Sequence, residues 1–163
     1  MHDQQEIIFS FRPMNFADAH NISSWHYPDD YSIYDVDADP QLQSAIYDEK
    51  NWGTKLFSVF NGGDQLIGIL SFEYDASKQY VELGLGLKPE LVGQGMGQSF
   101  AEACVHLVQV FYPDTTIILH VACFNQRAIK VYERVGFGKT NIRERKINGK
   151  EYIFQEMILV KSD

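Results

Sequence analysis

The chain has 163 residues, of which 45% are hydrophobic and 22% charged, and this size and composition are those of one globular domain rather than a disordered chain. No apolar run reaches the about 20 residues that a membrane-spanning helix requires, and two cysteines outside any CxxC pair exclude a disulfide scaffold or a zinc knuckle. The net charge of −8 argues against a nucleic-acid partner, because phosphate binding requires a basic face.

The negative charge is concentrated in the N-terminal part of the chain. Residues 1–50 contain ten acidic and two basic side chains, whereas the remaining residues contain twelve of each. No repeat, linker or low-complexity tract divides the chain, so we expect a single domain over residues 1–163. The first residues lack the sections of a secretory signal, and we therefore expect a cytoplasmic protein with no membrane partner.

Hydrophobic periodicity and turn residues predict the elements in chain order. The first half is predicted to contain a strand at 7–12, a helix at 15–25, an irregular loop at 27–40, a helix at 40–50, and strands at 55–61, 65–74 and 79–87. The second half is predicted to contain a helix at 97–111, a strand at 115–123, a helix at 125–135, and a hairpin of strands at 137–146 and 150–160. The order β-α-α-β-β-β-α-β-α-β-β predicts an α+β fold with helices on a mixed sheet.

A glycine-rich segment between a strand and a helix is the most informative feature. The strand at 79–87 carries Gly84 and Gly86 on one face, and glycines at 93, 95 and 97 lead directly into the next helix. Such glycines let backbone N–H groups approach a ligand beside the positive end of a helix. The segment predicts a phosphate-binding loop that works through backbone donors, with a glycine-rich turn that binds nothing as the alternative.

Two familiar phosphate loops do not fit this segment. A dinucleotide-binding GxGxxG pattern that begins at Gly93 requires a glycine where Gln98 stands, and one that begins at Gly95 requires it at Phe100. A P-loop ending at residues 138–140 lacks its upstream glycine and runs from helix to strand, the reverse of the required direction. The phosphate-binding loop is therefore of another kind.

Two segments at a characteristic separation resemble the GNAT superfamily of acyl-CoA-dependent N-acyltransferases. Residues 92–97, VGQGMG, resemble the family pattern (Arg/Gln)-x-x-Gly-x-(Gly/Ala), and residues 125–137, NQRAIKVYERVGF, resemble its N-x-x-A-x-x-x-Y-x-x-x-G-F segment. The element order agrees with the family from residue 7 to 160. Val92 departs from the pattern, because the family has Arg or Gln there. The resemblance implies a GNAT-like mixed sheet of about seven strands with helices on both faces.

The resemblance also implies acetyl-CoA as the cosubstrate and no metal. Backbone groups at the end of the strand at 79–87 would hold the pantetheine, and the glycine loop, residues 92–98, would hold the phosphates. Asn125 would contact the pantetheine arm, although its position suits a helix N-cap equally well. The cosubstrate-binding residues expected from the resemblance are Leu85, Gly86, Leu87, Val92, Gly93, Gln94, Gly95, Met96, Gly97, Gln98 and Asn125.

Acyl transfer to an amine requires a base for the amine, stabilisation of the carbonyl oxygen and an acid for the leaving thiolate. The resemblance assigns the acid to Tyr132, although position alone also suits a residue of the apolar stripe of its helix. Glu82, beside the strand glycines, and His120, in a buried strand, are both candidates for the base. The alternatives are a solvated strand residue for Glu82 and a hydrogen-bonded core residue for His120.

The family usually forms its acceptor site from the early helices and their loop. Here this region is the acidic segment, residues 25–39, in which carboxylates alternate with aromatic rings. Such a surface attracts a cation, which favours a polyamine, an aminoglycoside or a basic peptide terminus, whereas the alternative is a solvated acidic loop. The acceptor-binding residues expected are Trp25, Tyr27, Asp29, Asp30, Tyr31, Tyr34 and Asp35.

The function that the sequence predicts is direct transfer of an acetyl group from acetyl-CoA to a primary amine within a ternary complex. The partners expected are a small-molecule or peptide amine, and the sequence is compatible with a homodimer. The alternative from another class is an acyl-CoA-binding sensor that kept the glycine loop and lost catalysis. Tyr132 favours the enzyme, whereas Val92 and the unassigned base leave room for the sensor.

Overall fold

The computed structural model describes residues 8–160, which form a seven-stranded sheet with the strand order β1-β2-β3-β4-β5-β7-β6. The strands are β1 (Ser10–Pro13), β2 (Leu56–Phe60), β3 (Leu66–Asp75), β4 (Tyr80–Leu87), β5 (Thr116–Ala122), β6 (Phe137–Ile147) and β7 (Lys150–Leu159). The helices are α1 (Phe16–Ser23), α2 (Pro40–Ile46), α3 (Gly97–Phe111) and α4 (Gln126–Val135), with short 3-10 helices η1 (Asp29–Tyr34), η2 (Val36–Ala38), η3 (Glu49–Asn51) and η4 (Pro89–Leu91). The predicted α+β class, the strand number and the element order are confirmed.

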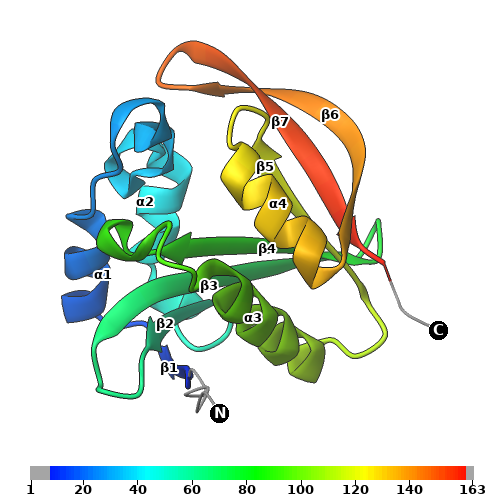
Figure 1. Cartoon of the computed structure of the whole chain (residues 1–163). Helices are drawn as coiled ribbons and strands as arrows, with labels where there is room; N and C mark the ends of the chain where they lie inside the picture. Colours follow the sequence, from blue (N-terminus) through cyan, green and yellow to red (C-terminus); the bar gives the residue numbers. More distant parts are fainter. Residues whose placement is uncertain (1–7, 161–163) are drawn as a thin grey trace, which may run out of the picture.

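Helices cover both faces of the sheet, as predicted. The apolar sides of α3 and α4 pack on one face over β4 and β5, where Val81, Leu83 and Leu119 are buried. On the other face, α1 and α2 pack over β2 and β3 around a second cluster that contains Ile22 and Ile46. Figure 1 shows this arrangement, with the long β6–β7 hairpin arching over the top of the molecule.

Most predicted boundaries lie within two residues of those observed, and α3 begins and ends at the predicted residues. The second predicted helix is too long, because α2 ends at Ile46 and Asp48 then caps η3 through its side chain. The first predicted strand includes Ile7, which lies outside the described residues; β1 begins at Ser10. None of the helices in the described part of the chain is long and apolar enough to cross a membrane.

The two central strands are paired over only part of their length. β4 and β5 run parallel from the pair Tyr80–Thr116 to the pair Leu83–Leu119, and no pairing follows. β4 nevertheless continues to Leu87 against β3, and β5 continues to Ala122 against β7. The ladder between the two strands therefore ends in the middle of the sheet, and we call the unpaired region between residues 84–87 of β4 and 120–122 of β5 the gap.

Candidate active site

Backbone groups of β4 line the gap between the separating strands. β3 and β4 are antiparallel, and the N–H of Lys88 donates to the carbonyl of Ile67, so Lys88 and Ile67 form a hydrogen-bonded pair. The next pair along the strands, Leu87 with Gly68, is therefore a non-hydrogen-bonded pair. Because such pairs alternate, the backbone N–H and C=O groups of Leu85 and Leu87 point away from β3 and into the gap, whereas those of Gly86 pair with β3. Leu85 and Leu87, two of the predicted contacts, can therefore pair with an extended ligand that carries amide groups.

The glycine loop connects β4, through η4, to the N-terminus of α3. Gly93 and Gly95 have φ angles of +79° and +82°, so the backbone takes the left-handed conformation at alternate residues. Such alternation turns successive N–H groups to one side and forms an anion-binding concavity. No side chain caps the first turn of α3, so its free N–H groups add to this concavity.

The last three residues of the glycine loop, residues 96–98, contact the core, α4 and α3. Met96 packs against the main core, and a Cβ at Gly97 would lie 3.5 Å from Val131 of α4. The side chain of Gln98 donates to Glu102 within α3. Gly97 therefore faces Val131 at an ordinary contact distance, and α3 and α4 lie side by side just behind the loop.

Tyr132 lies on α4, on the face of the sheet that α3 and α4 cover, where its ring meets Phe137 edge-on at 6.1 Å between centroids. Burial raises the pKa of Tyr132 far above its ordinary value, and Tyr34, Cys104 and Tyr27 reinforce that shift. The phenol is therefore protonated at neutral pH and can donate a proton. Its hydroxyl makes no hydrogen bond to any residue between 8 and 160, so that proton is not committed within this part of the chain.

Glu82 and His120, the two candidates for the base, lie in contact with each other on the opposite face of the sheet. Oε1 of Glu82 lies 2.6 Å from Nδ1 of His120. The Glu82 side chain is 47% exposed, whereas that of His120 is 10% exposed. The hydrogen bond from His120 lowers the pKa of Glu82 despite the opposing effect of burial. Glu82 is therefore the ionised, accessible member of the pair, and His120 is the group that orients it.

A second carboxylate, which the sequence did not indicate, lies on the other side of His120. Oε2 of Glu156, from β7, is 3.4 Å from Nε2 of His120. Its other oxygen accepts a hydrogen bond from the hydroxyl of Thr140 at 2.7 Å. The imidazole thus lies between carboxylates on the two neighbouring strands, with Nδ1 hydrogen-bonded to Glu82 and Nε2 without a hydrogen-bond partner among the described residues. Only the register of β5 against β7 reveals this, since His120 and Glu156 are direct cross-strand partners.

The acidic segment lies beside this face of the sheet and is attached to both central strands. The hydroxyl of Tyr27 donates to the carbonyl of Leu87 at 2.6 Å, at the end of β4. The hydroxyl of Tyr34 accepts from the N–H of Ala122, at the end of β5, and from the side chain of Asn125. Burial raises the pKa values of both phenols. Tyr27 and Tyr34 therefore fix the acidic segment at the mouth of the gap.

Asn125 caps α4, as its position predicts. Its Oδ1 accepts from the N–H of Ala128 at 3.2 Å, while its Nδ2 donates to Tyr34. One hydrogen of the amide group remains for a ligand, so the cap and a contact to the pantetheine arm are compatible. The predicted competition between these two roles does not arise, because they use different atoms.

Two of the residues expected to bind the acceptor serve to hold the acidic segment together. Trp25 is 7% exposed within the core, and its indole donates to Asn21 of α1. Asp35 is also 7% exposed and accepts from the backbone of Tyr27 and from His26. We therefore correct the expected roles of Trp25 and Asp35: burial and internal hydrogen bonds make them supports of the site.

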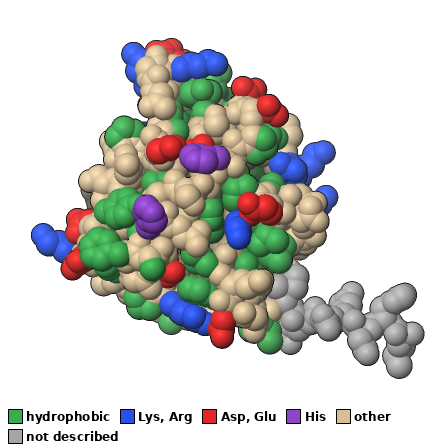
Figure 2. All heavy atoms as spheres, turned by 90° about the vertical axis from the view of Figure 1, so that its left-hand side faces the viewer, with side chains coloured by type: hydrophobic (Ala, Val, Ile, Leu, Met, Phe, Trp, Pro, Cys, Tyr) green, Lys and Arg blue, Asp and Glu red, His purple; other side chains and the backbone are tan. Residues whose placement is uncertain are grey.

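Of the other members of that set, Tyr27 and Tyr34 are half-buried and hydrogen-bonded to the central strands, and the remaining three are at least partly accessible. Asp29 and Asp30 are exposed at the start of η1, and Tyr31 contacts Phe124 edge-on at 5.5 Å. Figure 2 shows the molecule from the side of α1, where acidic side chains lie next to histidine near the middle of the face and most basic groups lie toward its edges. This face is suited to a positively charged molecule.

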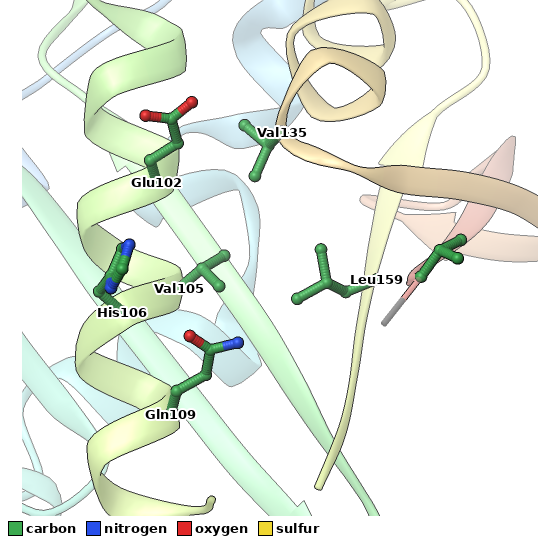
Figure 3. Close-up of a pocket in the computed structure, with 7 residues that line it drawn as sticks. Glu102, Val105, His106, Gln109, Val135 and Leu159 are labelled. Atoms are coloured by element: carbon green, nitrogen blue, oxygen red, sulfur yellow. The ribbon is translucent and has the colours of Figure 1, made fainter. Parts of the chain in front are cut away.

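A shallow groove elsewhere on the surface is separate from these features. It lies between α3 and the end of β7 (Figure 3), and its lining residues are Glu102, Val105, His106, Gln109, Val135, Leu159 and Val160. None of these residues is among those predicted for the site. The groove therefore takes no part in the arrangement around the gap.

The residues around the gap fit acetyl-CoA. The N–H and C=O of Leu85 and the N–H of Leu87 are free to pair with an extended arm that carries amides, whereas the C=O of Leu87 already accepts from Tyr27. The left-handed glycines at 93 and 95 offer N–H groups to phosphates. Tyr132 lies on one face of the sheet, and Glu82 lies on the other. A thioester in the gap would therefore have a proton donor and a carboxylate on opposite sides.

Comparisons with known proteins agree with this description. The acetyltransferase (GNAT) domain family matches residues 9–138 of the chain. A chimera of spermidine N-acetyltransferase SpeG from Vibrio cholerae and hSSAT is similar in structure, with a TM-score of 0.71 and 22% identity over 93% of this chain and 95% of that chain. A GNAT-family acetyltransferase from Bacillus anthracis has a TM-score of 0.71 at 17% identity, over 93% and 94%.

SpeG from Vibrio cholerae in complex with manganese ions has a TM-score of 0.67 and 22% identity, over 92% of this chain and 91% of that chain. No curated protein sequence matches the chain significantly. The structural likenesses, all below 25% identity, show a shared fold, whereas the domain match covers most of the chain. The chain belongs to the GNAT acetyltransferase family.

Proposed function

We propose that this protein transfers the acetyl group of acetyl-CoA to a cationic primary amine by direct attack in a ternary complex. The observation that carries the proposal is that Glu82 and Tyr132 lie on opposite faces of the sheet, with Glu82 on β4 close to the end of its pairing with β5. A base on one face and an acid on the other suit a reaction in which the nucleophile arrives from one side and the leaving group departs on the other.

In the proposed reaction, a C–N bond forms between the amine and the thioester carbonyl carbon as the C–S bond breaks. An ammonium group must first lose one proton to solvent to expose its lone pair, and the nitrogen then becomes acidic as it bonds to that carbon. The carboxylate of Glu82 accepts this second proton, directly or through water. Tyr132 donates its hydroxyl proton to the departing sulfur. The backbone N–H groups of Leu85 and Leu87 face the gap and can stabilise the carbonyl oxygen as charge develops there.

The proposal of a cationic acceptor is supported by the carboxylates on the face of the sheet that carries Glu82 and His120. Glu82 and Glu156 lie on this face of the sheet on either side of His120. The acidic segment, which is tied to the ends of β4 and β5 by Tyr27 and Tyr34, adds the exposed acids Asp29 and Asp30. Polyamines are one such class, and spermidine N-acetyltransferases are among the structures similar to this chain. An aminoglycoside or a basic peptide terminus carries the same charge.

A panel of amines tests the proposal through the thiol released from acetyl-CoA. It should contain polyamines, aminoglycosides and basic peptides, with neutral and anionic amines of similar size as matched controls. Release should be limited to cationic amines and should be accompanied by the N-acetylated product in equal amount. Binding of acetyl-CoA without release for any amine would instead favour an acyl-CoA-binding sensor.

A further inference from the structure

A single cation lies over the glycine loop, although the loop lacks a basic residue of its own. Arg127 is the second residue of α4, and its Nη1 lies 2.9 Å from the position that a Cβ would occupy on Gly93. Its guanidinium also lies 5.6 Å from the ring centre of Tyr31, which in turn contacts Phe124. The guanidinium is therefore held beside the loop by packing, and a side chain at Gly93 would displace it.

The electrostatic environment of Arg127, which is exposed, favours the binding of an anion. The guanidinium lies in the first turn of α4 and beside the loop that leads into α3, and the positive ends of both helix dipoles repel a cation. Neither first turn contains an acidic residue. Within residues 8–160, Arg127 forms no ion pair with any carboxylate. Three sources of positive potential thus converge, and the described residues supply no charge to balance them.

We infer that Arg127 binds the phosphates of acetyl-CoA and supplies from α4 the side-chain cation that Val92 does not provide. The inference depends on the proposed use of acetyl-CoA. Backbone donors of the loop would bind one side of the phosphates, and the guanidinium would bind the other through charge-assisted hydrogen bonds. Arg127 belongs to α4 and not to the loop, so sequence motifs centred on the loop would not indicate it.

The substitution Arg127→Gln tests this inference when two acyl donors are compared. We expect the Kd of acetyl-CoA, measured by calorimetry, to rise about tenfold or more, since a hydrogen bond to a charged group is lost. Its salt dependence should also weaken. S-acetylpantetheine, which has no phosphate, should be used equally well by both proteins. Arg134→Gln is the matched control, because it removes the same charge from the exposed end of the same helix.

A cation introduced within the loop itself, at position 92, shows whether Arg127 acts by binding phosphate or by supporting the structure. Val92→Arg in the Arg127→Gln background should recover most of the affinity for acetyl-CoA, whereas a protein that had lost only packing against Tyr31 would not recover. Equal losses with both acyl donors, or an unchanged Kd for acetyl-CoA, would overturn the inference about Arg127. Failure of the wild-type protein to bind acetyl-CoA at all would instead contradict the proposed function.

Discussion

The hydroxyl of Tyr27 donates a 2.6 Å hydrogen bond to the carbonyl oxygen of Leu87, 60 residues away in sequence. Tyr27 belongs to the acidic segment, whereas Leu87 is the last residue of β4, whose backbone faces the gap. One hydrogen bond therefore connects the expected acceptor site to the strand that is expected to hold the cosubstrate. It thereby fixes the position of the acidic segment relative to the end of β4, and direct transfer depends on how the two substrates are positioned relative to each other.

Tyr27→Phe should disturb both halves of the site. The loss of this hydrogen bond should lower the free energy of unfolding by about 0.5–1.5 kcal/mol, as measured in urea. The KM values of both substrates should rise. Tyr47→Phe removes a comparable bond, from Tyr47 to Ser23 at 3.1 Å, and should affect stability alone. Equal kinetic effects of the two substitutions would contradict a positioning role for Tyr27.

Glu82→Gln should reduce kcat by about 10²-fold or more, since general-base catalysis contributes that much. Acetyl-CoA affinity should change little. Glu73→Gln is the matched control, because Glu73 is the direct cross-strand partner of Glu82 and is exposed. If steady-state kinetics give the same kcat for Glu82→Gln and Glu73→Gln, the carboxylate of Glu82 acts only through surface charge.

The contact between His26 and Asp35 should make stability depend on pH. Nδ1 of His26 lies 3.0 Å from Oδ2 of Asp35, and this hydrogen bond raises the pKa of His26. A raised pKa stabilises the fold fully below the unfolded value of about 6.5, and the effect disappears as the pH rises through the folded value.

His26→Gln should therefore lower the midpoint of urea unfolding more at pH of about 5.5 than at about 9. At the higher pH, His26 is neutral in the folded and in the unfolded protein. His20→Gln is the control, since His20 is exposed and forms no ion pair within residues 8–160. A difference between wild type and His26→Gln that grows toward alkaline pH would show the opposite sign of linkage.

Gly95→Val should abolish acetyl-CoA binding, because its side chain would occupy the open space in which backbone donors face the phosphates. The φ angle of +82° adds strain of about 1–2 kcal/mol for any residue with a Cβ. Gly149→Val imposes similar strain at +76° in the distant β6–β7 turn, so it should lose stability and keep binding. Val92→Ala should matter little. Calorimetry distinguishes these outcomes.

Asp29→Asn with Asp30→Asn should raise the KM of a cationic acceptor and leave the Kd of acetyl-CoA unchanged. The attraction is screened over about 8 Å at physiological salt, so acceptor KM should also rise with ionic strength. Glu133→Gln with Glu151→Gln makes the same change in net charge outside the acidic segment, on exposed positions. If both pairs raise the KM equally, overall charge and not the acidic segment attracts the acceptor.

The sequence predicted the elements well because local rules determine them. The stripe of α3 has helical spacing, Asn125 and Gly136 mark the ends of α4, and Asn148 with Gly149 forms a tight turn. The sequence predicted an irregular loop where the structure has η1 and η2, since the acidic segment is held by hydrogen bonds of Tyr27 and Tyr34 to distant strands and shows no periodicity.

The parts of the site that were missed depend on register and packing. Glu156 is 36 residues from His120 and meets it only because β7 pairs with β5 in one register. Arg127 lies within a recognised segment, yet its proximity to Gly93 depends on how α4 packs beside the loop. His26 contacts a carboxylate nine residues later in sequence, and this pairing depends on the path of the acidic segment and not on a local pattern.

The central claim is that Tyr132 supplies the proton for acetyl transfer across the gap, and Tyr132→Phe tests it most directly. The substitution keeps the ring against Phe137 and removes only the hydroxyl. Thiol release from acetyl-CoA with the best amine should fall by about 10²-fold or more, while calorimetry should show nearly unchanged acetyl-CoA affinity and melting temperature. Unchanged turnover in Tyr132→Phe would contradict the claim.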